Sequence, residues 1–280
     1  MHPTTANTAT APSDAAGVAM RRVNLPGADE CTVPAEVIES GSGSAATFLH
    51  GLVGLNEHWE LVVERVEHAL RCTRLELPLL DLRGSDCSVE GVEALTIRFL
   101  EGHGASPSIL IGNSFGGHVA LRVALHRPDL VRGLVLAGSS GLFERTLVKG
   151  APLHPSRGWI REKIGELFHD ESNVREEDVD RAHAVLNTRG GKRAMIKLSR
   201  TARRNHLGDR IGEIRTPTLL IWGRDDIVTP PSAAEGFLEL LPDARVVWVE
   251  RCGHTPMLES PDLFADAVLS FADELEGRGL

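Results

Sequence analysis

A serine bracketed by glycines stands where an apolar run gives way to an amphipathic segment. The run covers residues 108–111, and the pentapeptide Gly-Asn-Ser-Phe-Gly follows at residues 112–116. A chain that passes from a strand straight into a helix must turn sharply, and the flanking glycines remove Cβ atoms that would collide there. Such a turn strains the serine backbone and presents its hydroxyl at the N-terminus of the next helix. The motif predicts a strand–turn–helix unit, a nucleophile elbow, with Ser114 at its apex.

Three further apolar runs each lead into a segment with polar or glycine residues. The runs cover residues 45–49, 218–222 and 245–249, and the segments that follow begin at His50, Gly223 and Cys252. The second segment contains Asp226 and the third contains His254. Because the carboxyl ends of parallel strands meet at one edge of a sheet, we expect both side chains to lie close to Ser114.

The chain order Ser, Asp, His is that of a Ser-His-Asp triad on an α/β-hydrolase scaffold. From about residue 33 to residue 275 the sequence resembles an α/β-hydrolase of the class that carries a helical cap. The resemblance implies an α/β fold with a mostly parallel central sheet flanked by helices. One element departs from the family pattern: members often read Asp-x-Pro-Gly-His-Gly-x-Ser after the fourth strand, whereas residues 81–88 read Asp-Leu-Arg-Gly-Ser-Asp-Cys-Ser. The change leaves the triad intact and the substrate specificity open.

Helical periodicity alternates with the short apolar runs. Residues 56–70 carry apolar side chains at helical spacing, and residues 89–100 repeat the pattern. The elbow helix is expected to stop near Pro128, before a strand at residues 131–137. This alternation predicts a mostly parallel sheet covered on both faces, with the ligand site beyond the carboxyl ends of the strands.

The alternation breaks between residues 141 and 210, which predicts an inserted helical cap. We expect residues 18–140 and 211–280 to form the core, and residues 1–17, rich in Thr, Ala, Ser and Pro, to form a flexible N-terminal tail. The predicted cap holds 15 Lys and Arg residues against 10 Asp and Glu, whereas the rest of the chain is acidic. Removing the cap is expected to change substrate preference more than triad geometry.

The last predicted cap helix has two contrasting faces. One face carries Gly191, Met195, Leu198 and Ala202, and the other carries Arg193, Lys197, Arg200 and Arg204. A basic stripe opposite a packing stripe is typical of a solvated face or of one paired with an acidic neighbour. An anchor for a substrate carboxylate is the alternative.

The candidate catalytic residues have complementary tasks. Ser114 needs a base to act as a nucleophile near neutral pH, and His254 is the candidate. The histidine in turn needs a carboxylate on its other ring nitrogen. Asp226 matches the family position, four residues before a proline, while Asp225 and the more distant Glu144 are alternatives.

Further site residues follow from the resemblance. The backbone N–H groups of Leu52 and Phe115 are the expected oxyanion-hole donors. The candidate substrate-binding residues are Asn113, Val53, Phe143 and Trp159. The Gly-Asn-Ser-x-Gly-Gly form at residues 112–117 is similar to that of carbon–carbon-bond hydrolases of meta-cleavage products, whose asparagine helps to hold the substrate. Those relatives often have a tryptophan near the catalytic histidine, which this chain lacks.

A serine nucleophile argues against the branches of the fold that attack with aspartate. The leading hypothesis is a serine hydrolase that acts on a small carboxylic ester through an acyl-enzyme. An acyltransferase or a meta-cleavage-type C–C hydrolase would reuse the same residues, and a non-catalytic ligand-binding protein is the alternative from another class. No cofactor and no metal are implied.

Charge and cysteine content limit the partners and the compartment. The formal net charge of -9 argues against a nucleic-acid partner. The sequence shows no secretory signal and no apolar stretch of about 20 residues, so no membrane association is expected. The four cysteines show neither metal-ligand spacing nor a C-x-x-C pair, and a reducing cytoplasm fits them best. The pattern does not indicate an oligomeric state.

Overall fold

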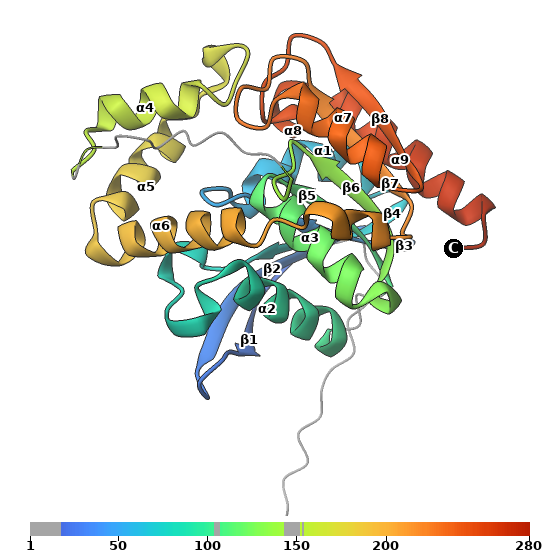
Figure 1. The fold of residues 1–280 in the computed structure, drawn as a ribbon, viewed down its shortest axis with the longest axis horizontal. Coiled ribbons are helices and arrows are strands. Elements are labelled where there is room, and N and C mark those ends of the chain that lie inside the picture. The colour runs from blue at the N-terminus through green and yellow to red at the C-terminus, as the bar shows by residue number, and fades with distance from the viewer. Residues whose placement is uncertain (1–17, 104–106, 143–151, 153) are drawn as a thin grey trace, which may run out of the picture.

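A central sheet of eight strands organises the molecule (Figure 1). The computed structural model describes residues 18–103, 107–142, 152 and 154–280. The strands are β1 (Ala19–Pro26), β2 (Thr32–Ser40), β3 (Ser44–Leu49), β4 (Leu70–Glu76), β5 (Ser108–Asn113), β6 (Val131–Ala137), β7 (Thr218–Gly223) and β8 (Ala244–Val249). Their spatial order is β1-β2-β4-β3-β5-β6-β7-β8, in which β2 pairs antiparallel with β1 and β4 and all the other pairs are parallel. The expected α/β fold with a mostly parallel sheet is confirmed.

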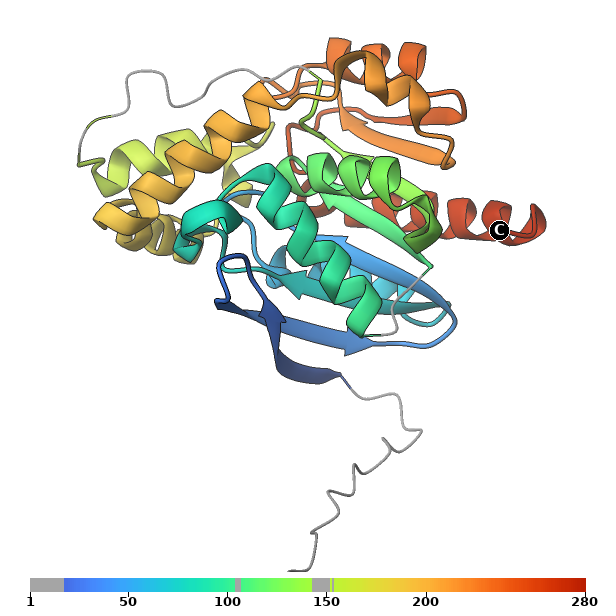
Figure 2. The ribbon, with the colours of Figure 1, turned by 60° about the horizontal axis from the view of Figure 1, so that its bottom comes forward.

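Helices cover both faces of this sheet (Figure 2). One face packs against α2 (Val89–Gly102), α3 (Phe115–His126) and α7 (Pro231–Leu240), and the other packs against α1 (Glu60–Val66), α8 (Pro256–Glu259) and α9 (Pro261–Gly277). Successive side chains of a strand point to opposite faces of the sheet, as β6 shows. Leu134 and Leu136 pack into the core on the first face, and Val135 and Ala137 pack into the core on the second. The apolar strands are therefore buried on both sides, as parallel strands usually are.

The predicted helix at residues 56–70 is shorter than its periodicity indicates. A 3-10 turn covers Asn56–Trp59, α1 ends at Val66, and Leu70 already belongs to β4. Leu70 is buried whether it lies on a helix or in a strand, so its apolar character cannot mark the boundary. Further 3-10 turns lie at Leu79–Asp81, Gly84–Asp86, Pro128–Leu130, Glu171–Asn173 and Gly208–Glu213.

Between β6 and β7 the described chain contains helices and no strand. These are α4 (Arg157–Gly165), α5 (Glu176–Leu186) and α6 (Arg189–Arg204), which lie together on the left in Figures 1 and 2. Ile160, Val179 and Ala182 form a small apolar cluster of their own between α4 and α5. In contrast, Ala194, Leu198 and Ala202 of α6 join the core of the sheet.

Candidate active site

Ser114 occupies a strained turn between β5 and α3. Its backbone angles are φ 53° and ψ -116°, a conformation that is unfavourable for a residue with a Cβ atom. Glycines make the turn possible: a Cβ on Gly112 would lie 2.5 Å from the carbonyl carbon of Gly116, and one on Gly116 would lie 2.2 Å from the oxygen of Leu49. Local sequence thus determines where the Ser114 hydroxyl is presented.

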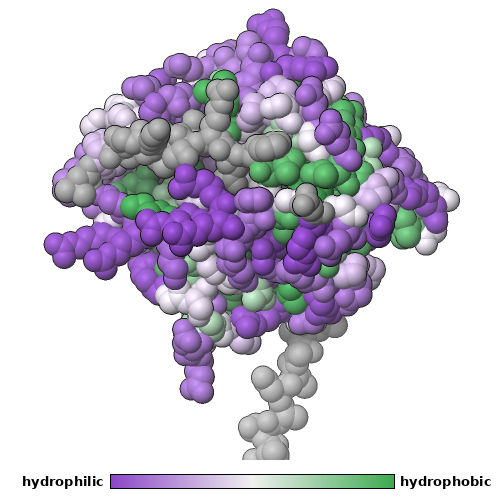
Figure 3. Space-filling model, viewed as in Figure 1, coloured by the Kyte–Doolittle hydropathy of each residue, from purple (hydrophilic) through white to green (hydrophobic). Residues whose placement is uncertain are grey.

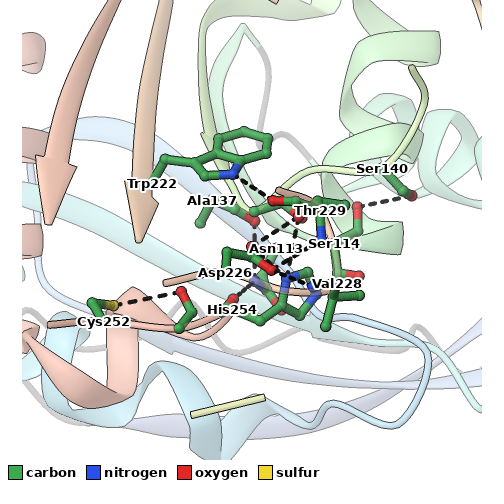
Figure 4. Close-up of polar contacts among 12 residues, drawn as sticks. Asn113, Ser114, Ala137, Ser140, Trp222, Asp226, Val228, Thr229, Cys252 and His254 are labelled. Atoms are coloured by element: carbon green, nitrogen blue, oxygen red, sulfur yellow. Dashed lines mark hydrogen bonds and ion pairs between the residues drawn. The ribbon is translucent and has the colours of Figure 1, made fainter. Parts of the chain in front are cut away.

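His254 and Asp226 form a buried pair beyond the ends of β8 and β7 (Figure 4). Their Nδ1 and Oδ2 atoms are 2.8 Å apart, and their side chains are 5% and 0% exposed. A carboxylate in this position fixes the tautomer of the histidine and leaves Nε2 unprotonated, as a general base requires.

The carboxylate of Asp226 is held by further hydrogen bonds. Oδ1 accepts from the backbone N–H groups of Val228 at 2.8 Å and of Thr229 at 2.9 Å, and Oδ2 accepts from the Thr229 hydroxyl at 2.9 Å. The preceding residue, Asp225, is half-exposed, and its carboxylate lies 2.9 Å from His169 Nδ1 instead. Of these two aspartates, Asp226 is the one whose carboxylate contacts His254 in the described structure.

Two residues of this centre were not identified from the sequence. Thr229 Oγ1 also lies 2.9 Å from the carbonyl oxygen of Gly138, which follows β6. Gly138 has φ +49°, and a Cβ there would lie 2.8 Å from His254 Nδ1 and 3.0 Å from Asp226 Oδ2. A glycine just past a strand was the available signal for Gly138, whereas nothing in the sequence distinguishes the role of Thr229 from that of any loop threonine.

The loop after β3 lies directly against the elbow. A Cβ on Gly51 would lie 3.5 Å from Cβ of Ser114, and Leu52 is the residue that follows Gly51 in the chain. Phe115 is the first residue of α3, and the first N–H of a helix has no partner within that helix. Both predicted oxyanion donors therefore come from segments that border Ser114.

The Ser114 hydroxyl makes no hydrogen bond within the described part of the chain, His254 Nε2 included. Catalytic hydrogen bonds are often long in a free enzyme and shorten when substrate binds. The carbonyl oxygen of Ser114, by contrast, accepts from the N–H of Ser140 at 3.1 Å, which ties the turn to the segment after β6.

Asn113 is buried and holds two backbone segments together. Its Nδ2 atom donates to the carbonyl oxygens of Ala137 and His254, both at 3.0 Å (Figure 4). An amide nitrogen has two protons, so both are already used. The contacts favour a positioning role for Asn113 over the substrate contact expected from the sequence.

A cleft of about 210 Å³ opens beside the loop after β3. It is bounded by the loop after β3, the segment after β4 and the inner face of α5; its lining includes His50, Leu52, Val53, Pro78, Arg181 and Val185. Val53, one of the candidate substrate-binding residues, lines this cleft. Trp159 instead packs against the cluster between α4 and α5. Phe143 and Glu144 lie outside the described residues.

Asp178 and Arg181, which line this cleft, belong to a network of charged side chains. His58 Nε2 lies 3.0 Å from Asp178 on α5, and Glu57 pairs with Arg181 at 2.7 Å and with Arg175 at 3.2 Å. Burial opposes ionisation of Asp178, but the hydrogen bond from His58 and the two arginines together hold its pKa below the usual range. The ligand atoms of Glu57, His58 and Asp178 are close enough for a metal ion, yet the arginines already neutralise the carboxylates.

Other charged and buried groups near the site have simpler roles. His50 is buried, its Nδ1 lies 2.7 Å from the carbonyl oxygen of Gly51, and burial lowers its pKa.

The basic residues of α6 named above are exposed and none is among the residues that line the cleft, which favours the solvated-face interpretation. Figure 3 shows hydrophilic side chains projecting on that side. Within the described ranges, none of the helices has both the length and the apolar character that a membrane crossing requires.

The sequence is similar to a known protein family and to several known enzymes. Residues 48–267 match the model of the Alpha/beta hydrolase family. The chain is 28% identical over 242 residues to the pimeloyl-[acyl-carrier protein] methyl ester esterase of Nitrosomonas europaea, covering 80% of this chain and 94% of the relative. It is 26% identical over 258 residues to the 2-hydroxy-6-oxo-6-phenylhexa-2,4-dienoate hydrolase of Comamonas testosteroni, covering 83% and 89%.

Solved structures agree with the fold. A meta-cleavage product hydrolase from Pseudomonas fluorescens superposes with a TM-score of 0.77 at 23% identity, covering 90% of this chain and 97% of that one. At this identity the likeness concerns the fold, and the relatives above include both esterases and C–C hydrolases.

Proposed function

Because the chain belongs to the Alpha/beta hydrolase family, we propose that Ser114, His254 and Asp226 form the catalytic triad of a serine hydrolase acting on small carboxylic esters. The observation that carries the proposal is the buried 2.8 Å contact between His254 and Asp226 beside a strained serine turn. Strain and buried charge at one place are costly to a fold and are characteristic of functional sites.

The proposed reaction proceeds in two steps. Ser114 Oγ attacks the ester carbonyl while His254 Nε2 takes its proton, and the N–H groups of Leu52 and Phe115 stabilise the oxyanion. His254 then gives the proton to the departing alcohol, which leaves an acyl-enzyme. A water molecule attacks the acyl-enzyme with the same base, and the acid is released as Ser114 recovers its proton. Asp226 stabilises the imidazolium in both steps.

The second candidate is a C–C hydrolase of the meta-cleavage type. It is supported by the Gly-Asn-Ser-Phe-Gly-Gly elbow and by the similarity to the Comamonas testosteroni enzyme. We place it second because the amide protons of Asn113 are both bonded to backbone carbonyls.

A fluorophosphonate probe tests the triad directly. We expect the probe to label Ser114 in the folded protein. The His254→Ala variant should react at least on the order of 100-fold more slowly. Equal labelling of the variant and the wild type would contradict the proposal. Comparing p-nitrophenyl esters with a dienol C–C substrate then separates the two candidates, since turnover of the dienol alone would favour the second.

The domain boundaries and the setting of the protein are part of the same proposal. Residues 141–210 would form the cap over the core of residues 18–140 and 211–280, which is supported by the helices α4 to α6. The substrate would be a small molecule. All four cysteines are free thiols, which supports a reducing compartment such as the cytoplasm.

A further inference from the structure

A short segment of the cap lies directly on the loop that carries His254. Residues 167–170, here called the cap strap, connect α4 to the 3-10 turn at Glu171–Asn173. The backbone N–H of His254 donates to the carbonyl oxygen of Leu167 at 2.7 Å. The proposed base thus takes one of its own backbone contacts from the cap rather than from the sheet.

Glu259, at the end of α8, joins the same two segments with one carboxylate. Its Oε1 accepts from the N–H of Gly253 at 2.7 Å. Its Oε2 accepts from the N–H groups of His169 at 2.8 Å and Asp170 at 3.3 Å. Hydrogen bonds to a carboxylate are stronger than those between neutral groups. The three bonds of Glu259 therefore hold the cap strap against the loop of His254.

Two further features make the contact close and specific. A Cβ on Gly253 would lie 2.5 Å from the oxygen of Leu167 and 2.9 Å from the carbonyl carbon of Phe168. The glycine before His254 is therefore needed for the approach of the strap. On the other side, His169 pairs with Asp225, the neighbour of Asp226.

We propose that Glu259 is a positioning residue that, together with the cap strap, holds the backbone of His254 so that its imidazole faces Ser114. The inference rests on the proposed triad. Gly253 and His254 are buried, and their N–H groups find their acceptors in Glu259 and Leu167. Displacing the strap would leave buried donors without partners and free the loop to shift. Removal of the cap would then damage the triad itself, contrary to the expectation from sequence that it changes mainly substrate preference.

The variant Glu259→Gln tests this. Glutamine keeps the length of the side chain but has one acceptor oxygen, and its amide N–H would face an N–H donor. Displacing a catalytic group by about 1 Å costs on the order of 100-fold, so we expect fluorophosphonate labelling and kcat to fall roughly 10- to 100-fold, with KM changed less than about twofold. Hydrogen exchange at residues 169–170 and 253–254 should accelerate together. Glu250→Gln is the matched control, because Glu250 is exposed and pairs with Arg224 at 3.2 Å.

Gly253→Ala approaches the contact from the other side and covers the case in which Glu259→Gln does not fold. Its methyl group should push the strap away and produce the same slow labelling and fast exchange. Labelling at the wild-type rate, a raised KM with normal labelling, or slow labelling without faster exchange would each overturn the proposal. A wild type that the probe does not label would contradict the proposed triad instead, and with it the positioning role, while the exchange data would still report whether Glu259 links the two segments.

Discussion

His254 Nδ1 lies 2.8 Å from Asp226 Oδ2, whereas the adjacent carboxylate of Asp225 points to His169. The two aspartates are neighbours in sequence, but one is buried and the other half-exposed. The turn after β7 thus directs one carboxylate toward His254 and the other toward His169, in the segment after α4.

Replacing each aspartate separately should give very different results. Asp226→Asn is expected to lower kcat on the order of 10⁴-fold, because the histidine loses the partner that sets its tautomer. Asp225→Asn changes only a partly exposed contact with His169 and should alter kcat by no more than a few-fold. Steady-state ester hydrolysis measures both, and similar losses in the two variants would argue against Asp226 as the triad acid.

The hydroxyl of Thr229 should matter for catalysis because it donates to the carboxylate of Asp226. Thr229→Val keeps the shape but removes a hydrogen bond to a carboxylate, and we expect kcat to fall roughly 10- to 100-fold. Thr255→Val is the control, since the buried Thr255 hydroxyl, next to His254, has no hydrogen-bond partner among the described residues. Its loss should leave kcat and the melting temperature unchanged or slightly raise the latter. A harmless Thr229→Val would show that backbone donors alone hold Asp226.

The sequence was sufficient where local chemistry determines the structure. The glycines beside Ser114 indicate a sharp turn, and the apolar runs of β6 and β7 indicate buried strands. The mostly parallel sheet could therefore be predicted, together with the polar segments that follow its strands. The end of α1 could not, because Leu70 suits either a helix or a strand. Thr229 and Glu259 were missed for a different reason: their partners lie on distant segments that meet only in the folded chain.

Asn113→Asp distinguishes a positioning role from a substrate contact. The change replaces a donor of two hydrogen bonds by an acceptor that faces the carbonyl oxygens of Ala137 and His254. We expect kcat to fall at least about tenfold with KM little changed. Separate measurement of kcat and KM decides the matter, because a raised KM with a normal kcat would indicate that Asn113 holds the substrate.

The cleft beside the loop after β3 should set the acyl length that the enzyme accepts. Val185 lines it from α5, so Val185→Trp is expected to lower kcat/KM for long-chain p-nitrophenyl esters at least about tenfold relative to the acetate. Ala184→Trp, at an exposed position on the same helix, is the control. An unchanged acyl-length profile for Val185→Trp would place the acyl chain elsewhere.

His118 should make the fold sensitive to acid. It lies one turn beyond Ser114 and is fully buried, and this burial lowers its pKa to about 3. Because its pKa is near 6.5 in the unfolded chain, the unfolded state binds the extra proton between these values. Stability is therefore fully present above about pH 6.5 and is lost at about 1.4 kcal/mol per pH unit below it. Denaturant titrations of His118→Leu between pH 7 and 4 should show a shallower loss than the wild type, while exposed His68→Leu should follow the wild type. Parallel curves for His118→Leu and the wild type would mean that His118 is protonated in the folded protein or that water reaches it.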